Sequence, residues 1–340
     1  MKIAVDIMGG DYAPLEIING ALAAVKNNQW LELILVGNEE TFKEHLPELP
    51  QRVEAVFSKT VMAMDESVEN LRRKKDSSIF VATSLVKEGK AAAVVSAGST
   101  GAQMAAGILL LGRIKGIKRP AIVIPFPTLN GDKLMLDGGA NPDATAENLM
   151  DFAILGNAYA KNALGLDAPK IGLLSNGAES HKGTVAVVGA HQMLKSAHDD
   201  NILNFIGNIE GRDAMNGKFD VMVCDGFSGN IVLKLTEGVA VGLFKLIKKE
   251  ITATFMRKIG AFLVKPGLMN LKKIFDYSAY GGAPLLGING VSIICHGSSK
   301  AKAIENAILN AGKCVERGFV SQLVDDVAIY RENQTKEVRE

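Results

Sequence analysis

Six short turns, rich in glycine and small polar side chains, are the segments of this sequence best suited to chemistry. Each follows an apolar run and offers free backbone N–H groups beside hydroxyl, amide or carboxylate side chains. Such groups bind phosphate or another oxyanion. Together they predict an enzyme with a phosphorylated or anionic ligand, and they occupy residues 6–11, 96–101, 137–141, 175–179, 225–230 and 296–299.

The standard phosphate-binding and nucleophile motifs do not occur in this sequence. No G-x-G-x-x-G follows an apolar run, the segment around Lys182 lacks the G-K-[ST] order of a P-loop, and G-x-S-x-G is missing. The five histidines show neither metal-ligand spacing nor an obvious Ser or Cys partner. The sequence therefore predicts transfer chemistry driven by binding and electrostatics, with no metal and no cofactor.

Three side chains at the turns are candidate catalytic groups. Lys182 lies between a strand pattern and a helix pattern, where its ammonium suits an anion held by helix N–H groups, or is a plain surface charge. Asp225 ends an apolar strand pattern and suits a base or an orienting group. Asn230 suits a donor to an oxyanion or a simple helix cap, and the sequence leaves both roles open.

Alternating strand and helix patterns must position these turns. Several strand patterns are apolar on both faces, which predicts a three-layer α/β/α sandwich with a mostly parallel sheet and ligands at the carboxyl ends of its strands. We expect strands at residues 2–6, 31–36, 53–57, 92–97, 121–126, 134–137, 170–175, 204–207, 220–225 and 291–296. We expect helices at residues 14–26, 101–113, 144–163, 184–195, 230–255 and 300–317.

No composition shift marks a linker between domains. We therefore expect one α/β catalytic domain over residues 1–330, with a division into two lobes left open, and a charged C-terminal tail over residues 331–340. Residues 91–112 form an uncharged stretch long enough to cross a bilayer. The serines and glycines in its middle predict instead a buried strand, a turn and a buried helix.

The overall charge excludes some partners. The 340 residues include 38 Lys and Arg against 37 Asp and Glu, and 47% are hydrophobic, which argues against a nucleic-acid binder. Cys224, Cys295 and Cys314 are isolated from one another in sequence, which indicates a chain of the reducing cytoplasm.

One segment departs from this balance. Residues 245–273 hold eight basic residues and one acid, interleaved with apolar side chains, and Pro266-Gly267 divides the run. The pattern predicts two basic amphipathic helices joined by a turn, forming an arm over about residues 244–275. Its faces suit an acidic partner, a membrane surface or a long acyl chain, and an ordinary core-packed helix is the alternative.

Nine further segments of this chain form a recognisable set. They are VDIMGGDYAP, LRRKKDSS, SAGSTGA, GRIKGIKRPA, LDGGAN, FIGNIEGRD, DGFSGN, YGGAPLLG and CHGSS. In this order, from Met1 to about Phe319, they resemble the bacterial phosphate acyltransferases of phospholipid synthesis. Tyr12 and Ser99 stand where that family commonly has His and Asn.

The resemblance implies an isocitrate-dehydrogenase-like or phosphotransacetylase-like fold, usually in a homodimer. It implies an enzyme that moves a fatty acyl group from acyl carrier protein to inorganic phosphate. The acyl phosphate is then used by a membrane acyltransferase, and the enzyme is cytoplasmic with peripheral membrane association.

This reaction gives the candidate residues roles as a hypothesis. Lys182 and the turn formed by Gly98, Ser99, Thr100 and Gly101 would bind phosphate, together with Ser298. Asn230 would hold the thioester carbonyl or the oxyanion, and Asp225 would hold Lys182 or a substrate proton. In the arm, Lys248, Lys249, Arg257 and Lys258 would dock the acidic carrier protein, or Phe262 and Leu263 would enter a membrane.

Two other classes of function remain as alternatives. One is an NAD(P)-dependent dehydrogenase of a related fold, against which the missing dinucleotide fingerprint counts. The other is a non-enzymatic regulator that binds acyl carrier protein without releasing its thiol.

Overall fold

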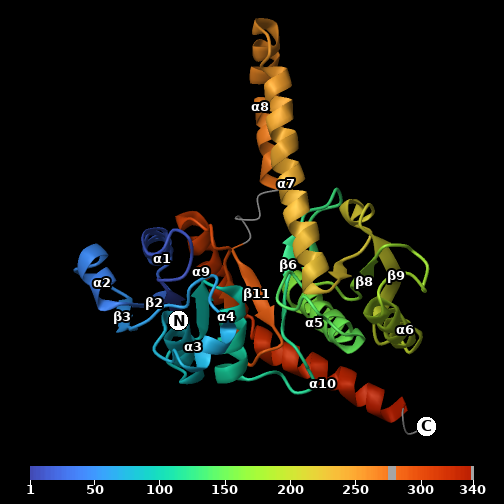
Figure 1. Ribbon diagram of the computed structural model, residues 1–340, viewed down its shortest axis with the longest axis horizontal. Coiled ribbons are helices and arrows are strands. Elements are labelled where there is room, and N and C mark those ends of the chain that lie inside the picture. Colours follow the sequence, from blue (N-terminus) through green and yellow to red (C-terminus); the bar gives the residue numbers. More distant parts are fainter. Residues whose placement is uncertain (275–280, 338–340) are drawn as a thin grey trace.

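The computed structural model describes residues 1–274 and 281–337, which fold into two lobes that each contain a β-sheet (Figure 1). The first lobe holds a seven-stranded sheet in the order β3-β2-β1-β4-β12-β11-β5. Its first five strands run parallel, whereas β11 is antiparallel to both its neighbours. In the order of the sheet, the strands are Val53–Phe57, Glu32–Gly37, Lys2–Asp6, Ala93–Ser96, Val291–Ile294, Ala283–Leu286 and Ala121–Ile122.

The second lobe holds a five-stranded sheet in the order β6-β7-β10-β8-β9. Only β6, at the edge, is antiparallel to its neighbour among these strands. In the order of the sheet, the strands are Ile124–Phe126, Lys133–Leu136, Val221–Val223, Lys170–Ser175 and Asn204–Glu210. The α/β class with mostly parallel strands is confirmed, but the expectation of one sheet is wrong because the structure has two.

The predicted strand over residues 121–126 shows where the chain divides. It forms two short strands, β5 and β6, which belong to different sheets. Val123 lies between them, and its N–H donates to the carbonyl of Pro284. An apolar run of this length cannot be distinguished from one continuous strand by its pattern alone.

Helices cover both faces of each sheet, which explains the strands that are apolar throughout. In β1, Ile3 and Val5 belong to one buried cluster and Ala4 to another on the opposite face. In the first lobe, α1 (Leu15–Asn27) and α9 (Ala301–Glu316) contact one face, and α3 (Ser78–Lys87) contacts the other beside α4 (Thr100–Ala106). α2 (Glu39–His45) lies at the edge near β3 (Figure 1).

The second lobe is layered in the same way. α5 (Ala146–Leu164) and α6 (Val185–Asp199) pack on one face, and the first turns of α7 (Gly226–Ile251) pack on the other. α10 (Phe319–Glu337) contacts both α5 and α9 and so joins the lobes. It continues through most of the segment predicted as a charged tail, and Arg331 in it pairs with the buried Asp151 of α5.

α7 and α8 (Phe255–Ile274) lie side by side and extend away from the two lobes (Figure 1). The arm is thus a pair of helices, but its turn lies at residues 252–254 and not at Pro266-Gly267. Pro266 lies inside α8, where it removes one backbone hydrogen bond of an exposed helix.

The uncharged stretch at residues 91–112 forms β4, a turn, α4 and a π-helical turn at Gly107–Leu111. The predicted strand, turn and helix are therefore confirmed there. None of the helices in the described part of the chain is long and apolar enough to cross a bilayer. The described residues also form two short 3₁₀ helices, at Val68–Arg72 and Ala214–Asn216.

Candidate active site

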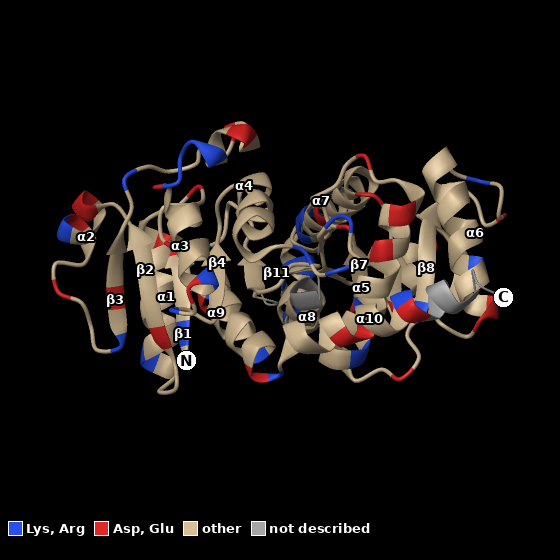
Figure 2. Cartoon of the chain, turned by 90° about the horizontal axis from the view of Figure 1, so that it is seen from below, with Lys and Arg blue, Asp and Glu red and all other residues tan. Residues whose placement is uncertain are grey.

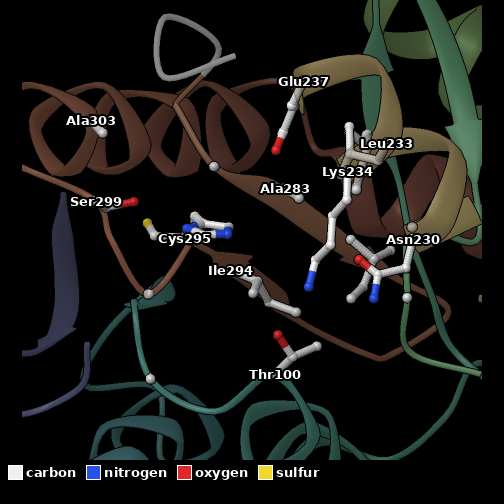
Figure 3. A pocket seen from close by; sticks show the side chains of 18 of the residues that line it. Thr100, Asn230, Leu233, Lys234, Glu237, Ala283, Ile294, Cys295, Ser299 and Ala303 are labelled. Carbon is white, nitrogen blue, oxygen red and sulfur yellow. The ribbon is translucent and has the colours of Figure 1, made fainter. Parts of the chain in front are cut away.

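A cavity of about 360 Å³ lies at the carboxyl ends of strands from both lobes. Five of the six predicted turns contribute residues to its lining, as expected for ligand binding in parallel α/β sheets (Figure 3). From the first lobe come Asp11, Gly98, Thr100, His296, Gly297 and Ser299, and from the second Gly138, Gly139 and Asn230.

One face of α7 supplies polar side chains to this cavity. Asn230, Lys234 and Glu237 follow one another at intervals of one helical turn, and all three line it (Figure 3). Among the described residues, Lys234 is the Lys or Arg side chain in the lining. An ammonium group and a carboxamide one turn apart form a site for an anion and for a polarised carbonyl.

α7 reaches this position because two glycine-rich turns of the second lobe pack tightly together. A Cβ atom on Gly226 would lie 2.7 Å from the backbone nitrogen of Asn141, and one on Gly229 would lie 2.1 Å from the carbonyl oxygen of Asp137. Neither position therefore tolerates a side chain. The Gly226 N–H also donates to the carbonyl of Asn141 at 2.8 Å, which fixes the start of α7 against the Gly138-Gly139 turn.

Asp137 organises the turn that carries Gly138 and Gly139. Its fully buried carboxylate accepts hydrogen bonds from the N–H of Ile122 at 2.9 Å and from both the backbone and the side chain of Asn141 at 2.6 and 2.9 Å. Burial raises the pKa of Asp137, and these hydrogen bonds oppose the rise. Since Ile122 lies on β5, the carboxylate also ties the two lobes together beside the cavity.

Asp6 organises a turn in the first lobe as Asp137 does in the second. Its buried carboxylate accepts a hydrogen bond from the hydroxyl of Ser96 at 2.8 Å and another from the N–H of Met8 at 3.1 Å. The Ser96 oxygen in turn accepts from the N–H of Gly98 at 3.0 Å. Asp6 therefore holds the turn whose Gly98 and Thr100 line the cavity.

The turn after β12 brings an imidazole and hydroxyl groups to the cavity. The Nδ1 atom of His296 lies 2.7 Å from the Ser298 hydroxyl and accepts from the Ser298 N–H at 3.2 Å. His296 and Ser299 line the cavity, while Ser298 braces the imidazole from outside the lining.

The rest of the lining is largely apolar. Its side chains come from both sheets, from α7 and α9, and from the loop after β3, and they face the same space as Asn230 and Lys234: Met64, Ile122, Ile124, Pro125, Leu233, Ala283, Ile294 and Ala303. A cavity with apolar walls and a few converging polar groups is typical of a small-molecule site.

Cys295 also lines the cavity, but its chemistry is that of a buried thiol. Burial raises its pKa to about 12, so the thiol stays protonated near neutrality. A protonated thiol is a poor nucleophile. The described residues contain no group of three or more His, Cys, Asp and Glu side chains arranged to hold a metal ion.

The structure brings three predicted site residues together and sets others beside them. Gly98, Thr100 and Asn230 line the cavity, whereas Ser99, Gly101 and Ser298 flank it in the same turns. The Ser99 hydroxyl caps α4 by accepting from the N–H of Ala102. Asp225 caps α7, and its carboxylate accepts from the N–H and the hydroxyl of Ser228 at 2.8 and 2.7 Å.

Lys182 lies apart from this group. It is exposed on the turn between β8 and α6, outside the cavity lining. The sheet order explains the separation, because β10 lies between β7 and β8 and the turn after β8 is one strand further from the first lobe. Strand order cannot be read from the succession of strands along the chain.

Lys234 and Glu237 are cavity residues that the sequence reasoning missed. Their signal was the helical spacing after Asn230, because residues 230, 234 and 237 must share a helix face.

The side chains of the arm are well exposed. Phe262 and Leu263 on α8 have exposed fractions of 76% and 73%. Lys248, Lys249 and Lys258 are exposed as well, while Arg257 pairs with Glu250 at 3.3 Å. Figure 2 shows Lys and Arg residues around α7 and α8. Residue 275, where the predicted arm ends, lies outside the described residues.

The two-lobed α/β fold with a cavity at the strand ends defines a protein of the phosphotransacetylase fold. A phosphotransacetylase from Streptococcus pyogenes is similar with a TM-score of 0.60 and 21% identity, covering 93% of this chain and 94% of that one. EutD phosphotransacetylase from Staphylococcus aureus gives a TM-score of 0.57 at 16% identity over 92% and 94% of the two chains. At such identities the likeness shows the fold alone.

Sequence comparison then gives the family. Residues 1–322 match the family model described as fatty acid synthesis protein. A phosphate acyltransferase from Desulfitobacterium hafniense is 56% identical over 95% of this chain and 96% of its own length. One from Moorella thermoacetica is 51% identical over 96% and 95%. The chain belongs to the phosphate acyltransferase family of enzymes.

Proposed function

We propose that this enzyme transfers a fatty acyl group from the thioester of acyl carrier protein to inorganic phosphate, which attacks the carbonyl directly. The observation that carries the proposal is the composition of the cavity. Lys234, Asn230 and the glycine-rich turns stand beside an apolar wall within one space of about 360 Å³. An acyl phosphate has the same two parts, an anionic head and an apolar chain.

Phosphate binding is the first requirement of this reaction. The ammonium of Lys234, the hydroxyl of Thr100 and the backbone of the Gly98 turn face the cavity together. These groups suit a doubly charged anion, and they hold its oxygen for attack on the carbonyl carbon. Ser99, Gly101 and Ser298 flank the cavity lining, so in this proposal they shape the phosphate-binding turns and do not bind phosphate directly.

Asn230 suits the second requirement, which is charge stabilisation on the thioester oxygen. Its side chain enters the cavity from the N-terminal part of α7, one helical turn from Lys234 (Figure 3). A carboxamide N–H that donates to the developing oxyanion lowers the barrier. Asp225 holds Asn230 indirectly, because it caps the helix that carries it.

The apolar wall suits the acyl chain. Ile122, Ile124 and Leu233 line the cavity near the polar groups, so the carbonyl can lie against Asn230 while the chain follows the wall. Burying the chain there would contribute about 0.8 kcal/mol for each CH₂ group.

We propose the arm as the contact for carrier protein and for a membrane surface. Its exposed lysines complement an acidic protein, and Phe262 and Leu263 suit the apolar side of a bilayer interface. An enzyme peripherally bound there would release acyl phosphate near the membrane acyltransferase that consumes it.

The predicted homodimer is supported by α7. Along one face this helix exposes apolar side chains spaced three or four residues apart, where a solvated helix face would be polar. A second copy that packs its own α7 against this stripe would cover it. The stripe comprises Ile231, Leu235, Val239, Leu243 and Leu246.

Product identification tests the proposed reaction. The enzyme is incubated with acyl-acyl carrier protein and labelled inorganic phosphate, and trapping with hydroxylamine detects the acyl phosphate. Label in an acyl phosphate supports the proposal, and thioester hydrolysis without labelled product would refute it. A parallel titration with NAD(P)H separates the dehydrogenase alternative, which requires saturable binding of that cofactor.

A further inference from the structure

Glu237 is an acidic side chain in the cavity, and the proposed binding of phosphate, carbonyl and acyl chain gives it no role. It lies on α7 one helical turn beyond Lys234 and two turns beyond Asn230 (Figure 3). The carboxylate therefore shares a helix face with the two groups proposed to bind phosphate and carbonyl. A carboxylate beside a phosphate site weakens anion binding if it is ionised, so its presence requires an explanation.

The surroundings of Glu237 shift its carboxyl group toward the protonated form. The residue is half-buried, and its Oε1 atom is buried without a hydrogen-bond partner. Burial raises the pKa of Glu237, while the charges of His296 and Lys234 oppose the rise. Asp11, on the turn after β1, and the Cys295 thiol are the other titratable groups of the described lining.

The proposed reaction needs a proton at one specific atom. When phosphate forms the C–O bond and the C–S bond breaks, the sulfur leaves as a thiolate, whose conjugate acid has a pKa of about 8.5. The phosphate oxygens meanwhile become more acidic, because one of them now carries an acyl group. A group between sulfur and phosphate that gives a proton to one and takes a proton from the other balances the reaction.

We propose that Glu237 is this proton carrier, an inference that rests on the proposed acyl transfer. Its carboxyl donates a proton to the departing sulfur as the C–S bond breaks, giving the free thiol of the carrier. Its carboxylate then takes the proton that the acylated phosphate loses. Glu237 ends as it began, one proton has passed from phosphate to thiol, and no oxidant or further reactant is required.

The neighbouring groups are less suited to this task. The His296 imidazole is exposed to solvent, and Ser298 holds it by two contacts at Nδ1. Asp11 is exposed, so water keeps its carboxylate solvated. Glu237 combines a cavity position with an unpartnered buried oxygen that can reach a bound ligand.

Two variants and the pH dependence of turnover test the proposal. Glu237→Gln keeps the shape but cannot carry the proton, and Glu237→Asp keeps the carboxyl on a shorter stem. We expect Glu237→Gln to lower kcat about 10²-fold or more with little change in the KM for phosphate, and Glu237→Asp to restore part of the rate. Thermal unfolding of each variant confirms that it is folded.

The pH profile separates catalysis from a structural role. The wild-type rate falls as pH rises through the raised pKa of Glu237, because the donating form disappears, and Glu237→Gln lacks this fall. The rate ratio of Glu237→Gln to wild type should therefore rise with pH, since Lys234, His296, Asp11 and phosphate are common to both enzymes. A ratio that is constant with pH, or a Gln variant within about 3-fold of wild type, overturns the proposal.

Failure of the proposed function has a different result. If the wild-type enzyme releases no thiol when phosphate is added, acyl transfer to phosphate is refuted, and the role of Glu237 is refuted with it. If the wild type releases thiol and the Gln variant matches it at every pH, only the role of Glu237 is refuted.

Discussion

The carboxylate of Asp6 accepts a hydrogen bond of 2.8 Å from the hydroxyl of Ser96, and both side chains are almost completely buried. This contact joins the ends of β1 and β4 beneath the Gly98 turn. Burial raises the pKa of Asp6, although hydrogen bonds from Ser78, Ser96 and the backbone oppose the rise.

The stability of the protein should therefore depend on the ionisation of Asp6. A carboxyl whose pKa is higher in the folded than in the unfolded state binds more protons when folded, so the free energy of unfolding falls as pH rises from about 4 through the folded-state pKa. Asp6→Asn cannot ionise and should lack this part of the fall. Urea unfolding of both proteins at several pH values measures it, and identical pH dependences would contradict the assignment.

Lys182 requires a different experiment, because it does not line the cavity of its own chain. The hypothesis from sequence predicts that Lys182→Ala lowers acyl phosphate formation at least ~100-fold. Because Lys182 lies outside the cavity of its own chain, this loss requires that Lys182 enters the cavity of the second copy in the proposed homodimer. In an equal mixture of Lys182→Ala and Asn230→Ala chains, about half of the dimers contain one chain of each kind, and each mixed dimer has one intact site of two. The mixture should therefore restore about one quarter of the wild-type rate.

Two outcomes would contradict that role of Lys182. Near-normal turnover of Lys182→Ala would remove the residue from the mechanism. A large loss that mixing does not restore would show that the residue acts within its own chain.

The basic side of the arm should determine affinity for the carrier protein. Reversing Lys248 and Lys249 to Glu should raise the KM for acyl-acyl carrier protein about tenfold at low ionic strength, and less at high salt, because charge attraction is screened. Steady-state kinetics measure it. Reversal of Lys26 and Lys87, exposed on the first lobe, is the matched control. An equal change in the control would show a general charge effect instead.

The apolar side of the arm should determine membrane binding. Leu263→Asp should abolish cosedimentation with vesicles of anionic phospholipid, because a charge replaces an apolar anchor. Leu129→Asp is the control, since Leu129 has an exposed fraction of 78% on the loop between β6 and β7. Unchanged binding of Leu263→Asp would exclude this part of α8 as the anchor.

The sequence predicted the local features of this site better than their arrangement. The turns after β1, β4, β7, β10 and β12 were recognisable because each follows a buried apolar strand and contains glycine beside polar groups. Gly226 and Gly229 explain why such a turn contains glycine, since no side chain fits where this turn packs against Asp137 and Asn141.

Features that depend on tertiary arrangement could not be predicted in this way. Strand order determines that residues 121–126 are divided between two sheets and that β8 lies beyond β10. β11 was missed because it is short and contains Pro284, which is uncommon in a strand. Lys234 differs from these, because helical spacing from Asn230 would have identified it.

Phosphate is proposed to meet the thioester in the cavity between the lobes. Free thiol released from acyl-acyl carrier protein, with and without phosphate, tests it most directly in wild type, Asn230→Ala and Lys234→Ala. We predict phosphate-dependent release by the wild type and a loss of about 10²-fold or more in each variant, the usual effect of removing one transition-state donor. Release that is independent of phosphate, or variants as active as the wild type, would contradict the claim.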